Sequence, residues 1–258
     1  MASNIVFKLK ILRKVKGTLR NWRTFVCAYF GFIKNKYVTL ETKTGIKIRL
    51  RTNSTDLMAF IHVWLIQEYS RQGFEIKEND IIVDIGAHIG LFALYASQSC
   101  KKGKIYCFEP VKLNFDLLIG NLELNKTQNI TPFNLAVSEN AEKIKIFINQ
   151  DDAGHSMFVP SDKFIEANSI SIKQIFDQNN IEKCNFLKLD CEGAEYEIID
   201  SLPQNYFDKI EKMIIEYHFA NTKPALLENL TKKLESLSYK VDRKKLFEDI
   251  GFLYVVRS

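Results

Sequence analysis

The ten residues IIVDIGAHIG, Ile81 to Gly90, constrain the fold of this chain more than any other segment. Three apolar β-branched residues open it and predict a short buried strand that ends at Asp84. Gly86 and Gly90 then predict a tight turn, and the apolar residues after them predict a helix over 91–97. A strand, a glycine turn and a helix in this order are typical of a nucleotide-type α/β site.

The spacing of the glycines excludes two common phosphate-binding turns. The dinucleotide motif G-x-G-x-x-G needs a glycine where His88 stands, and the P-loop needs a Lys-Ser or Lys-Thr pair that does not follow Gly90. The acid Asp84 would also repel a pyrophosphate, and it suits a cationic or zwitterionic ligand. The alternative is an ordinary strand–turn–helix unit in which Asp84 is the helix N-cap.

A second apolar run, Ile105 to Phe108, ends in Glu109. A carboxylate at the end of the second strand of such a unit can accept hydrogen bonds from both hydroxyls of a ribose. S-adenosylmethionine combines a ribose with an ammonium group. Asp84 and Glu109 together therefore favour this ligand over a dinucleotide.

The rest of the chain alternates between apolar strands and helices, which predicts a parallel sheet with helices on both faces. The expected core strands are Ile81–Asp84, Ile105–Glu109, Ile130–Val137, Phe186–Asp190 and Lys212–Tyr217, with a closing pair at Tyr239–Asp242 and Phe252–Arg257. The longest expected helices are Lys112–Asn125 and Pro224–Ser238. Between the third and fourth core strands, Lys143–Ile148 and Met157–Val159 predict an inserted hairpin.

The first 36 residues contain nine Lys or Arg and no acid, whereas the rest of the chain is mildly acidic. Apolar residues recur at spacings of three and four from Leu12 to Ile33, which predicts an amphipathic helix interrupted only at Gly17. A basic amphipathic helix with Trp and Phe fits an anionic membrane surface. Two alternatives stay open: a helix packed on the protein's own body, and a partner that is nucleic acid.

The expected organisation has three parts. Residues 1–36 form the basic helical segment, residues 37–75 a hairpin and a helix, and residues 76–258 the ligand-binding domain. In the middle part, Tyr37–Leu40 and Ile46–Leu50 predict the hairpin, and Asp56–Ser70 predicts the helix.

Composition places the chain among ordinary globular proteins, with 46% hydrophobic and 26% charged residues in a length of 258. Its five cysteines are odd in number and match no zinc spacing, which predicts reduced thiols and a cytoplasmic location. No apolar stretch approaches the ~20 residues of a transmembrane helix, and no signal peptide is expected.

Acidic residues gather at the expected carboxyl ends of the last two core strands. Asp190 and Glu192 follow one strand, and Glu216 and His218 end the next. Ligands of open α/β sheets bind outside these strand ends, and clustered carboxylates suit either general-base work or a divalent cation. Glu195 and Glu197 lie inside the following helix, where we expect solvated side chains or partners of the helix dipole.

Several segments in this order resemble the FkbM family of S-adenosylmethionine-dependent methyltransferases. They are RTNSTD followed by EY, VDIGAHIG, FEP, NLAVSE, AGHSMF and LKLDCEGAEYEII. The resemblance covers roughly residues 45–218 and leaves out the basic N-terminal helix. It implies an α/β fold with a doubly wound, mostly parallel seven-stranded sheet of the class I methyltransferase type, Rossmann-like, with an N-terminal helix and hairpin appendage.

The resemblance also implies roles for individual residues. The expected contacts of S-adenosylmethionine are Asp84, Gly86, Ala87, His88, Gly90, Glu109, Pro110, Ala136, Val137 and Ser138. The expected catalytic residues are Asp190, Glu192 and His218, with His155 in the insertion as an alternative, and a metal, if required, would bind Asp190, Glu216 and His218. At position 88 the family more usually has a small polar residue. The histidine here therefore affects only the expected conformation of the turn, and the expected binding site stays the same.

The expected reaction is O-methylation of a hydroxyl on a glycan, a lipid-linked saccharide or a small metabolite, inside the cell and at the inner face of the membrane. An RNA methyltransferase is one alternative, although KLDCEG stands where base-nitrogen enzymes carry D/N-P-P-F/Y. A nicotinamide dehydrogenase is disfavoured by the missing glycine. A binding protein with a vestigial methyltransferase core is the alternative outside catalysis.

Overall fold

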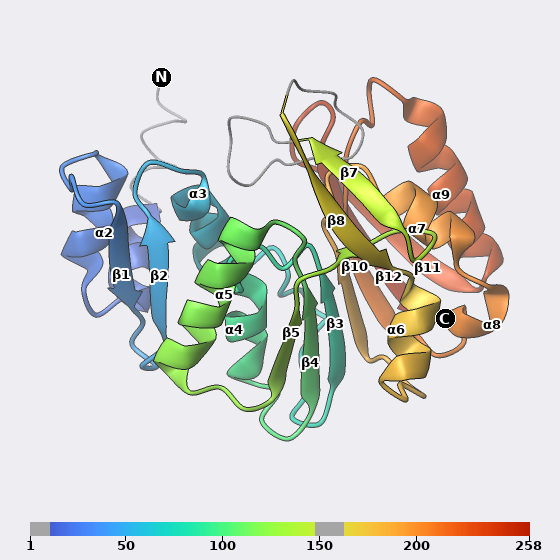
Figure 1. Cartoon of the computed structure of the whole chain (residues 1–258), viewed down its shortest axis with the longest axis horizontal. Coiled ribbons are helices and arrows are strands. Elements are labelled where there is room, and N and C mark those ends of the chain that lie inside the picture. The colour runs from blue at the N-terminus through green and yellow to red at the C-terminus, as the bar shows by residue number, and fades with distance from the viewer. Residues whose placement is uncertain (1–10, 148–162) are drawn as a thin grey trace.

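The computed structural model describes residues 11–147 and 163–258 (Figure 1). Its centre is a seven-stranded sheet in the order β11-β12-β10-β9-β3-β4-β5. The strands are β3 (Ile81–Ile85), β4 (Lys104–Phe108), β5 (Ile130–Phe133), β9 (Phe186–Leu189), β10 (Lys212–Tyr217), β11 (Tyr239–Lys245) and β12 (Gly251–Arg257). All neighbours from β10 to β5 are parallel, and β12 runs antiparallel to both β10 and β11. The expected mostly parallel seven-stranded α/β sheet is confirmed.

Alternate residues of the central strands face two separate apolar cores. Ile82 and Ile105 join the core on one side, and Val83 and Tyr106 join the core on the other. The first core contains residues of α4 (Leu91–Ser97) and α5 (Lys112–Asn125). The second contains residues of α6 (Ile172–Gln178), α7 (Glu195–Ser201), α8 (Gln204–Phe207) and α9 (Pro224–Ser236). The strands are therefore buried on both faces, as expected for a doubly wound sheet.

The expected single strand Ile130–Val137 is wrong. Its two ends belong to different sheets, because β5 stops at Phe133 and β6 (Ala136–Val137) pairs with β8 (Phe164–Ile170). Asn134 lies between them and donates from Nδ2 to the carbonyl oxygens of Glu109 at 2.9 Å and Pro110 at 3.0 Å. These bonds turn the chain over the end of β4, away from the central sheet.

Only the first strand of the expected inserted hairpin is found among the described residues, and it belongs to a small separate sheet whose strand β8 was not expected. β7 (Lys143–Phe147) pairs antiparallel with β8, in the sheet order β6-β8-β7. The second strand expected for the hairpin, Met157–Val159, lies outside the described residues, as does His155.

The expected continuous amphipathic helix from Leu12 to Ile33 is wrong. Residues 11–18 are helical and α2 (Trp22–Tyr29) is a second helix. Between them the chain pairs with the hairpin of β1 (Tyr37–Glu41) and β2 (Lys47–Arg51), since Leu19 forms a bridge with Thr42 and the Arg20 N–H donates to the Glu41 carbonyl at 2.8 Å. The stripe residues Val15 and Leu19 are buried in the same core as the sheet, and Trp22, Val26 and Ile33 pack against it. Most of the stripe therefore packs on the protein's own body.

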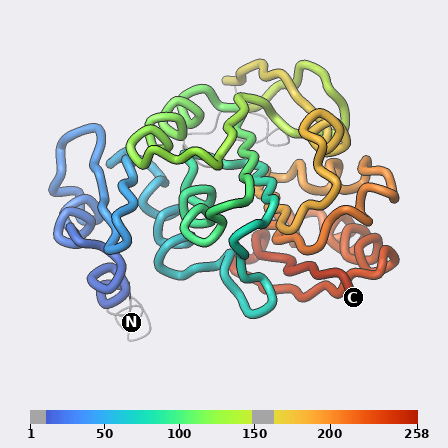
Figure 2. The backbone as a smooth tube through the Cα atoms, turned by 90° about the horizontal axis from the view of Figure 1, so that it is seen from below, coloured from blue at the N-terminus to red at the C-terminus, as the bar shows by residue number. Residues whose placement is uncertain are grey.

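The expected helix Asp56–Ser70 is shorter and changes type. It begins as α3 (Asp56–Phe60), continues as the π-helix η1 (Ile61–Ile66) and ends at Gln67, whose φ is +61°. The N-terminal elements lie at one side of the molecule and the C-terminal strands at the other (Figure 2). Among the described helices, none is long and apolar enough to cross a bilayer.

Candidate functional site

A cavity of about 630 Å³ opens at the carboxyl ends of β3, β4, β9 and β10. Most of its lining residues come from three parts of the chain. The sheet contributes the loops after these strands, the N-terminal segment contributes α3, η1 and Tyr69, and the loop between β11 and β12 contributes Phe247 and Ile250. The strand ends thus meet one edge of the cavity, and segments from both ends of the chain close it.

The glycine turn after β3 requires its first glycine on two grounds. Gly86 has a φ of +76°, in the left-handed region. A Cβ atom there would lie 1.8 Å from the backbone oxygen of Asp190, so any side chain would push the end of β9 away. Gly86 therefore brings the loops after β3 and β9 together.

Glu109 is buried beside this turn and lines the cavity. Its Oε2 accepts from the His88 backbone N–H at 2.9 Å, and its Oε1 accepts from the Val111 backbone N–H at 2.9 Å. Burial raises the pKa of Glu109 to about 7, although these bonds oppose the shift. The fixed carboxylate can accept further hydrogen bonds from a ligand in the cavity.

The residues expected to contact the methyl donor fall into two groups. The cavity is lined by Gly86, Ala87, His88, Glu109, Pro110, Ala136 and Val137. Asp84, Gly90 and Ser138 are not among its lining residues. Gly90 sits against the Leu118 side chain, and the Ser138 hydroxyl donates to the Asn140 carbonyl at 2.6 Å.

Asp84 lies behind the cavity wall, paired with a lysine. Its side chain is fully buried, and the Lys188 Nζ lies 3.1 Å from Oδ1. Lys188 also donates to the Gly86 carbonyl at 2.8 Å and lies 3.6 Å from Asp190 Oδ2. Burial lowers the pKa of Lys188, but Asp84 and Asp190 outweigh it, so that the net shift is upward and the lysine stays charged. Asp84 acts on the cavity through Lys188, which lines it.

His88 links the glycine turn to the N-terminal segment. Arg51 at the end of β2 directs Nη2 to His88 Nε2 at 3.1 Å, to Asp56 Oδ1 at 2.7 Å and to Asn114 Oδ1 at 2.9 Å. The pKa of His88 is lowered to about 4, chiefly by burial. The ring is therefore neutral at pH 7, and Nε2 can accept a hydrogen bond from Arg51. His88 therefore anchors the turn, a larger role than the sequence pattern indicates.

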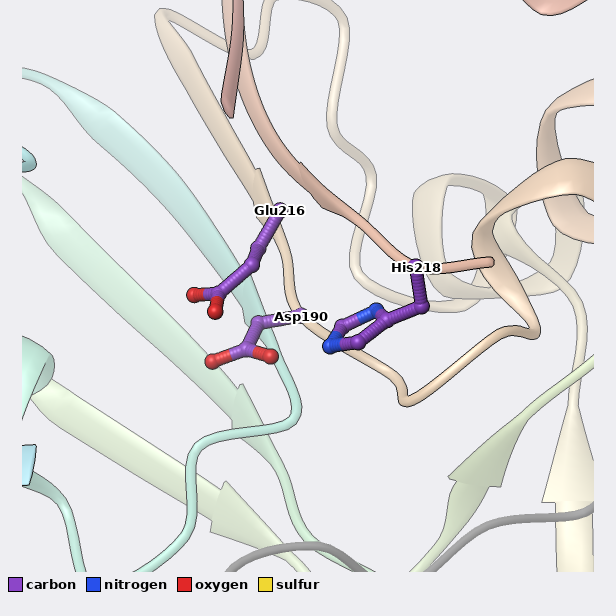
Figure 3. Close-up of side chains that lie close together, drawn as sticks. All are labelled: Asp190, Glu216 and His218. Atoms are coloured by element: carbon purple, nitrogen blue, oxygen red, sulfur yellow. The ribbon is translucent and has the colours of Figure 1, made fainter. Parts of the chain in front are cut away.

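Asp190, Glu216 and His218 converge at the ends of β9 and β10, as Figure 3 shows. One potential ligand atom from each lies within 4.8 Å of the other two. Asp190 and Glu216 line the cavity. A carboxylate pair and an imidazole at this separation could hold a divalent cation, and the expected metal ligands are indeed brought together.

The His218 ring lies between two glutamates. Its Nδ1 is 3.1 Å from Glu195 Oε1, and its Nε2 is 3.4 Å from Glu192 Oε2. Glu195 is fully buried and also accepts from the backbone N–H groups of Gly193 and His218, so the expectation of a solvated side chain is wrong for it. Burial lowers the pKa of His218, but Glu195 and then Glu192 outweigh it and raise the pKa to about 10. The ring is therefore an imidazolium at pH 7.

Glu192 stands at the cavity wall in a strained backbone conformation, with a φ of +53°. Such strain is concentrated at functional sites. Burial raises the pKa of Glu192 to about 7, against the opposing charge of His218. A carboxylate with this pKa exchanges protons readily near neutral pH.

Tyr69, Lys188 and Glu195 are parts of the site to which the sequence assigned no role there, although all three lie in the segments EY and LKLDCEGAEYEII that carry the family resemblance. Tyr69 is buried and donates from its hydroxyl to Glu216 Oε2 at 3.1 Å and to Asp190 Oδ2 at 3.4 Å. It follows η1, far from the core motifs in sequence. Only Lys188 carried a usable signal, as a single charge inside an apolar strand.

Fold and site together define a class I methyltransferase architecture. Residues 84–241 match the sequence model described as the Methyltransferase FkbM domain. The chain belongs to this family, and the resemblance seen in the sequence motifs is confirmed.

Three named relatives show how similar in sequence this chain is to known methyltransferases. Methyltransferase sdnD of Sordaria araneosa is 24% identical over 61% of this chain and 73% of its own length. Hexuronic acid methyltransferase AglP of Haloferax volcanii is 25% identical, over 69% of this chain and 71% of its own length. 31-O-demethyl-FK506 methyltransferase FkbM of Streptomyces tacrolimicus is 21% identical, over 58% of this chain and 70% of its own length.

The crystal structure of methyltransferase FkbM from Methylobacillus flagellatus superimposes with a TM-score of 0.52 at 20% identity. The match covers 77% of this chain and 53% of that chain, so this protein spans about half the length of that structure. It supports the fold.

Proposed function

We propose that this protein transfers a methyl group from S-adenosylmethionine to a hydroxyl oxygen of a saccharide, with a lipid-linked saccharide as the favoured acceptor. The observation that carries the proposal is Glu192, a cavity-lining carboxylate whose pKa is raised to about 7 by burial. Membership of the FkbM domain family supports methyl transfer. The names of the Haloferax and Streptomyces relatives, which refer to a hexuronic acid and to a 31-O position, support an oxygen acceptor.

The cavity fits the donor in size and chemistry. Its volume of about 630 Å³ lies within the usual range for small-molecule sites. Glu109 presents a fixed carboxylate for the ribose hydroxyls, and Pro110 and Val137 provide apolar walls for the adenine. When bound, the donor supplies a methyl group on a positively charged sulfur.

Glu192 is the general base in this proposal. A saccharide hydroxyl is a weak nucleophile until its proton is removed. Glu192 takes that proton as the oxygen forms its bond to the methyl carbon, and the carbon–sulfur bond breaks with its electrons going to sulfur. His218, as an imidazolium 3.4 Å from Glu192, keeps a share of the base in its ionised form. Asp190 and Glu216, held by Tyr69, then accept hydrogen bonds from neighbouring hydroxyls of the acceptor.

The charge of the acceptor side favours a neutral saccharide. Asp190, Glu192 and Glu216 all line this part of the cavity, whereas Lys188 is occupied by Asp84. Carboxylate or phosphate groups next to the acceptor hydroxyl would be repelled by the ionised forms of Asp190 and Glu192. Burial and Asp190 raise the pKa of Glu216 well above its ordinary value, so this side chain adds less to the repulsion. Met58 and Phe247 line the same cavity and are exposed, which suits an apolar lipid leaving the cavity toward a membrane surface.

Transfer from donor labelled in its methyl group to a fractionated cell extract tests the proposal. We expect the label in the lipid and glycan fractions, and its loss with Glu192→Gln. Label in RNA would replace the acceptor assignment with the RNA alternative. No transfer to any fraction, with intact donor binding, would contradict catalysis and favour the vestigial core.

A further inference from the structure

Three aromatic side chains at the end of α2 and in the loop after it stand exposed. The exposed fractions are 43% for Tyr29, 54% for Phe30 and 75% for Phe32. The rings form a continuous group, with centroids 5.4 Å apart from Tyr29 to Phe30 and 6.2 Å apart from Phe30 to Phe32. We call these residues the aromatic patch. Contiguous exposed aromatic surface of this kind marks an interaction site more often than chance.

The surroundings of the aromatic patch are basic. Arg23, Lys34 and Lys36 are exposed next to it in the chain, and no acid occurs among residues 1–36. Aromatic rings sit well at the headgroup level of a bilayer, and lysine and arginine beside them are attracted to anionic lipids. The chemistry of the patch is complementary to an anionic bilayer surface.

The loop after α2, which contains Phe32, is tied at its end to β2, and β2 is joined through Arg51 to the glycine turn. The Thr52 hydroxyl at the end of β2 donates to the Asn35 carbonyl at 2.7 Å, and the Thr52 N–H donates to the Lys36 carbonyl at 3.1 Å. The preceding residue, Arg51, reaches His88 in the glycine turn. In Figure 1 the loop between α2 and β1 lies at the left side of the molecule, on the same side as α3.

We propose that the aromatic patch and its flanking lysines bind an anionic lipid bilayer and so bring the protein to the membrane surface. The binding surface differs from the one the sequence pattern predicts. Val15 and Leu19 of the apolar stripe are buried and unable to enter a bilayer. Phe30 belongs to both sets, and Phe32 lies outside the stripe. The lipid surface itself is independent of the proposed reaction, and only the delivery of a lipid-linked acceptor rests on the proposed function.

Vesicle flotation of the full-length protein, without donor or acceptor, tests this proposal. One set of vesicles is phosphatidylcholine alone, and the other contains phosphatidylglycerol as well. We expect binding to the anionic set and little to the neutral set. Phe30→Ser with Phe32→Ser should weaken binding about tenfold or more. Lys34→Gln with Lys36→Gln should weaken it roughly thirtyfold, because each lysine near an anionic surface contributes about 1 kcal/mol.

Leu113→Ser is the matched control, because Leu113 is 74% exposed on α5 and lies outside the patch. It should leave flotation unchanged, and all variants should keep the wild-type melting temperature. Three results would overturn the proposal: equal binding by wild type and both double variants, no flotation with anionic vesicles, or patch-dependent dimerisation in solution. Competition by RNA that displaces the protein from vesicles, with tighter binding to RNA than to lipid, would also overturn it. None of these readouts depends on methyl transfer, so their failure is distinct from failure of the proposed function.

Discussion

The Tyr69 hydroxyl lies 3.1 Å from Glu216 Oε2 and donates a hydrogen bond to it, which joins the N-terminal segment to the end of β10. Burial raises the pKa of Tyr69 well above its ordinary value, so the hydroxyl stays protonated and remains a donor. Tyr69 lies outside the region 84–241 that matches the family model. The acceptor side of the cavity is therefore completed by a part of the chain outside the family domain.

Tyr69→Phe removes this donor and keeps the ring. We expect turnover to fall about tenfold, the usual consequence of losing one hydrogen bond to a charged group. The Kd of S-adenosylmethionine should not change, because Tyr69 bonds to residues on the acceptor side. Steady-state rates and calorimetry separate the two effects. Tyr254→Phe is the control, since Tyr254 is equally buried but donates to the Glu68 carbonyl. Equal losses in both variants would show a structural effect only.

Glu109→Ala should abolish the ribose contacts and weaken donor binding by about 100-fold, since two hydrogen bonds to one carboxylate are lost. Asp190→Asn should leave donor binding close to wild type and lower turnover. Isothermal calorimetry with S-adenosylmethionine measures both, with Glu123→Ala on the exposed side of α5 as control. Undiminished donor affinity in Glu109→Ala would refute the assignment of the donor site.

Local sequence patterns correctly predicted the helices and strands in which the spacing of apolar residues directly reflects which side chains are buried. The helix Lys112–Asn125 and the strand Lys212–Tyr217 have their expected bounds. Where the outcome depends on a distant partner, the patterns failed. Nothing local indicates that Ala136–Val137 pairs with β8 instead of continuing β5, or that Leu19 pairs with Thr42.

The same division applies to the site. Glu109 and Asp190 follow apolar strands and Glu216 lies near the end of another, so that parallel topology alone brings their carboxylates to one edge. Tyr69 enters from an irregular segment after a π-helix, and its position depends on how η1 packs against α4. Packing between elements is not encoded in a short motif. For that reason the sequence assigned roles to the carboxylates, whereas it marked Tyr69 only as part of the EY segment of the resemblance, without a role at the site.

Glu192→Gln should lower turnover by more than about 100-fold if Glu192 is the base. In the wild type, turnover should rise as the pH passes through about 7, because the pKa of Glu192 is raised to about 7 and only its ionised form accepts the proton. Rate–pH profiles at saturating donor measure this. The control is Glu197→Gln, an exposed position on α7. A profile that keeps its midpoint in Glu192→Gln would assign the base elsewhere.

Removal of divalent cations should leave activity intact. Both ring nitrogens of His218 are already engaged, Nδ1 with Glu195 at 3.1 Å and Nε2 with Glu192 at 3.4 Å. Rates before and after exhaustive dialysis against EDTA, with and without added Mg²⁺ or Mn²⁺, measure this. Activity lost on dialysis and restored by one cation would instead assign Asp190, Glu216 and His218 as metal ligands. Asp190→Asn should then also weaken direct binding of Mn²⁺.

The stabilising contribution of His218 to the folded protein should decrease as the pH rises from about 7 to 10. Its pKa in the folded protein is about 10, above the ordinary value of about 6.5, so the folded state holds the proton more tightly than the unfolded state. The stabilisation is therefore complete below about 6.5 and is lost as the pH approaches 10. Melting temperatures of wild type and His218→Gln, measured at intervals from pH 6 to pH 10, isolate this contribution, because other titrating groups are shared. The difference between the two proteins should shrink steadily with rising pH. A constant difference would mean that His218 contributes by packing and hydrogen bonding alone, without the charge that Glu195 and Glu192 stabilise.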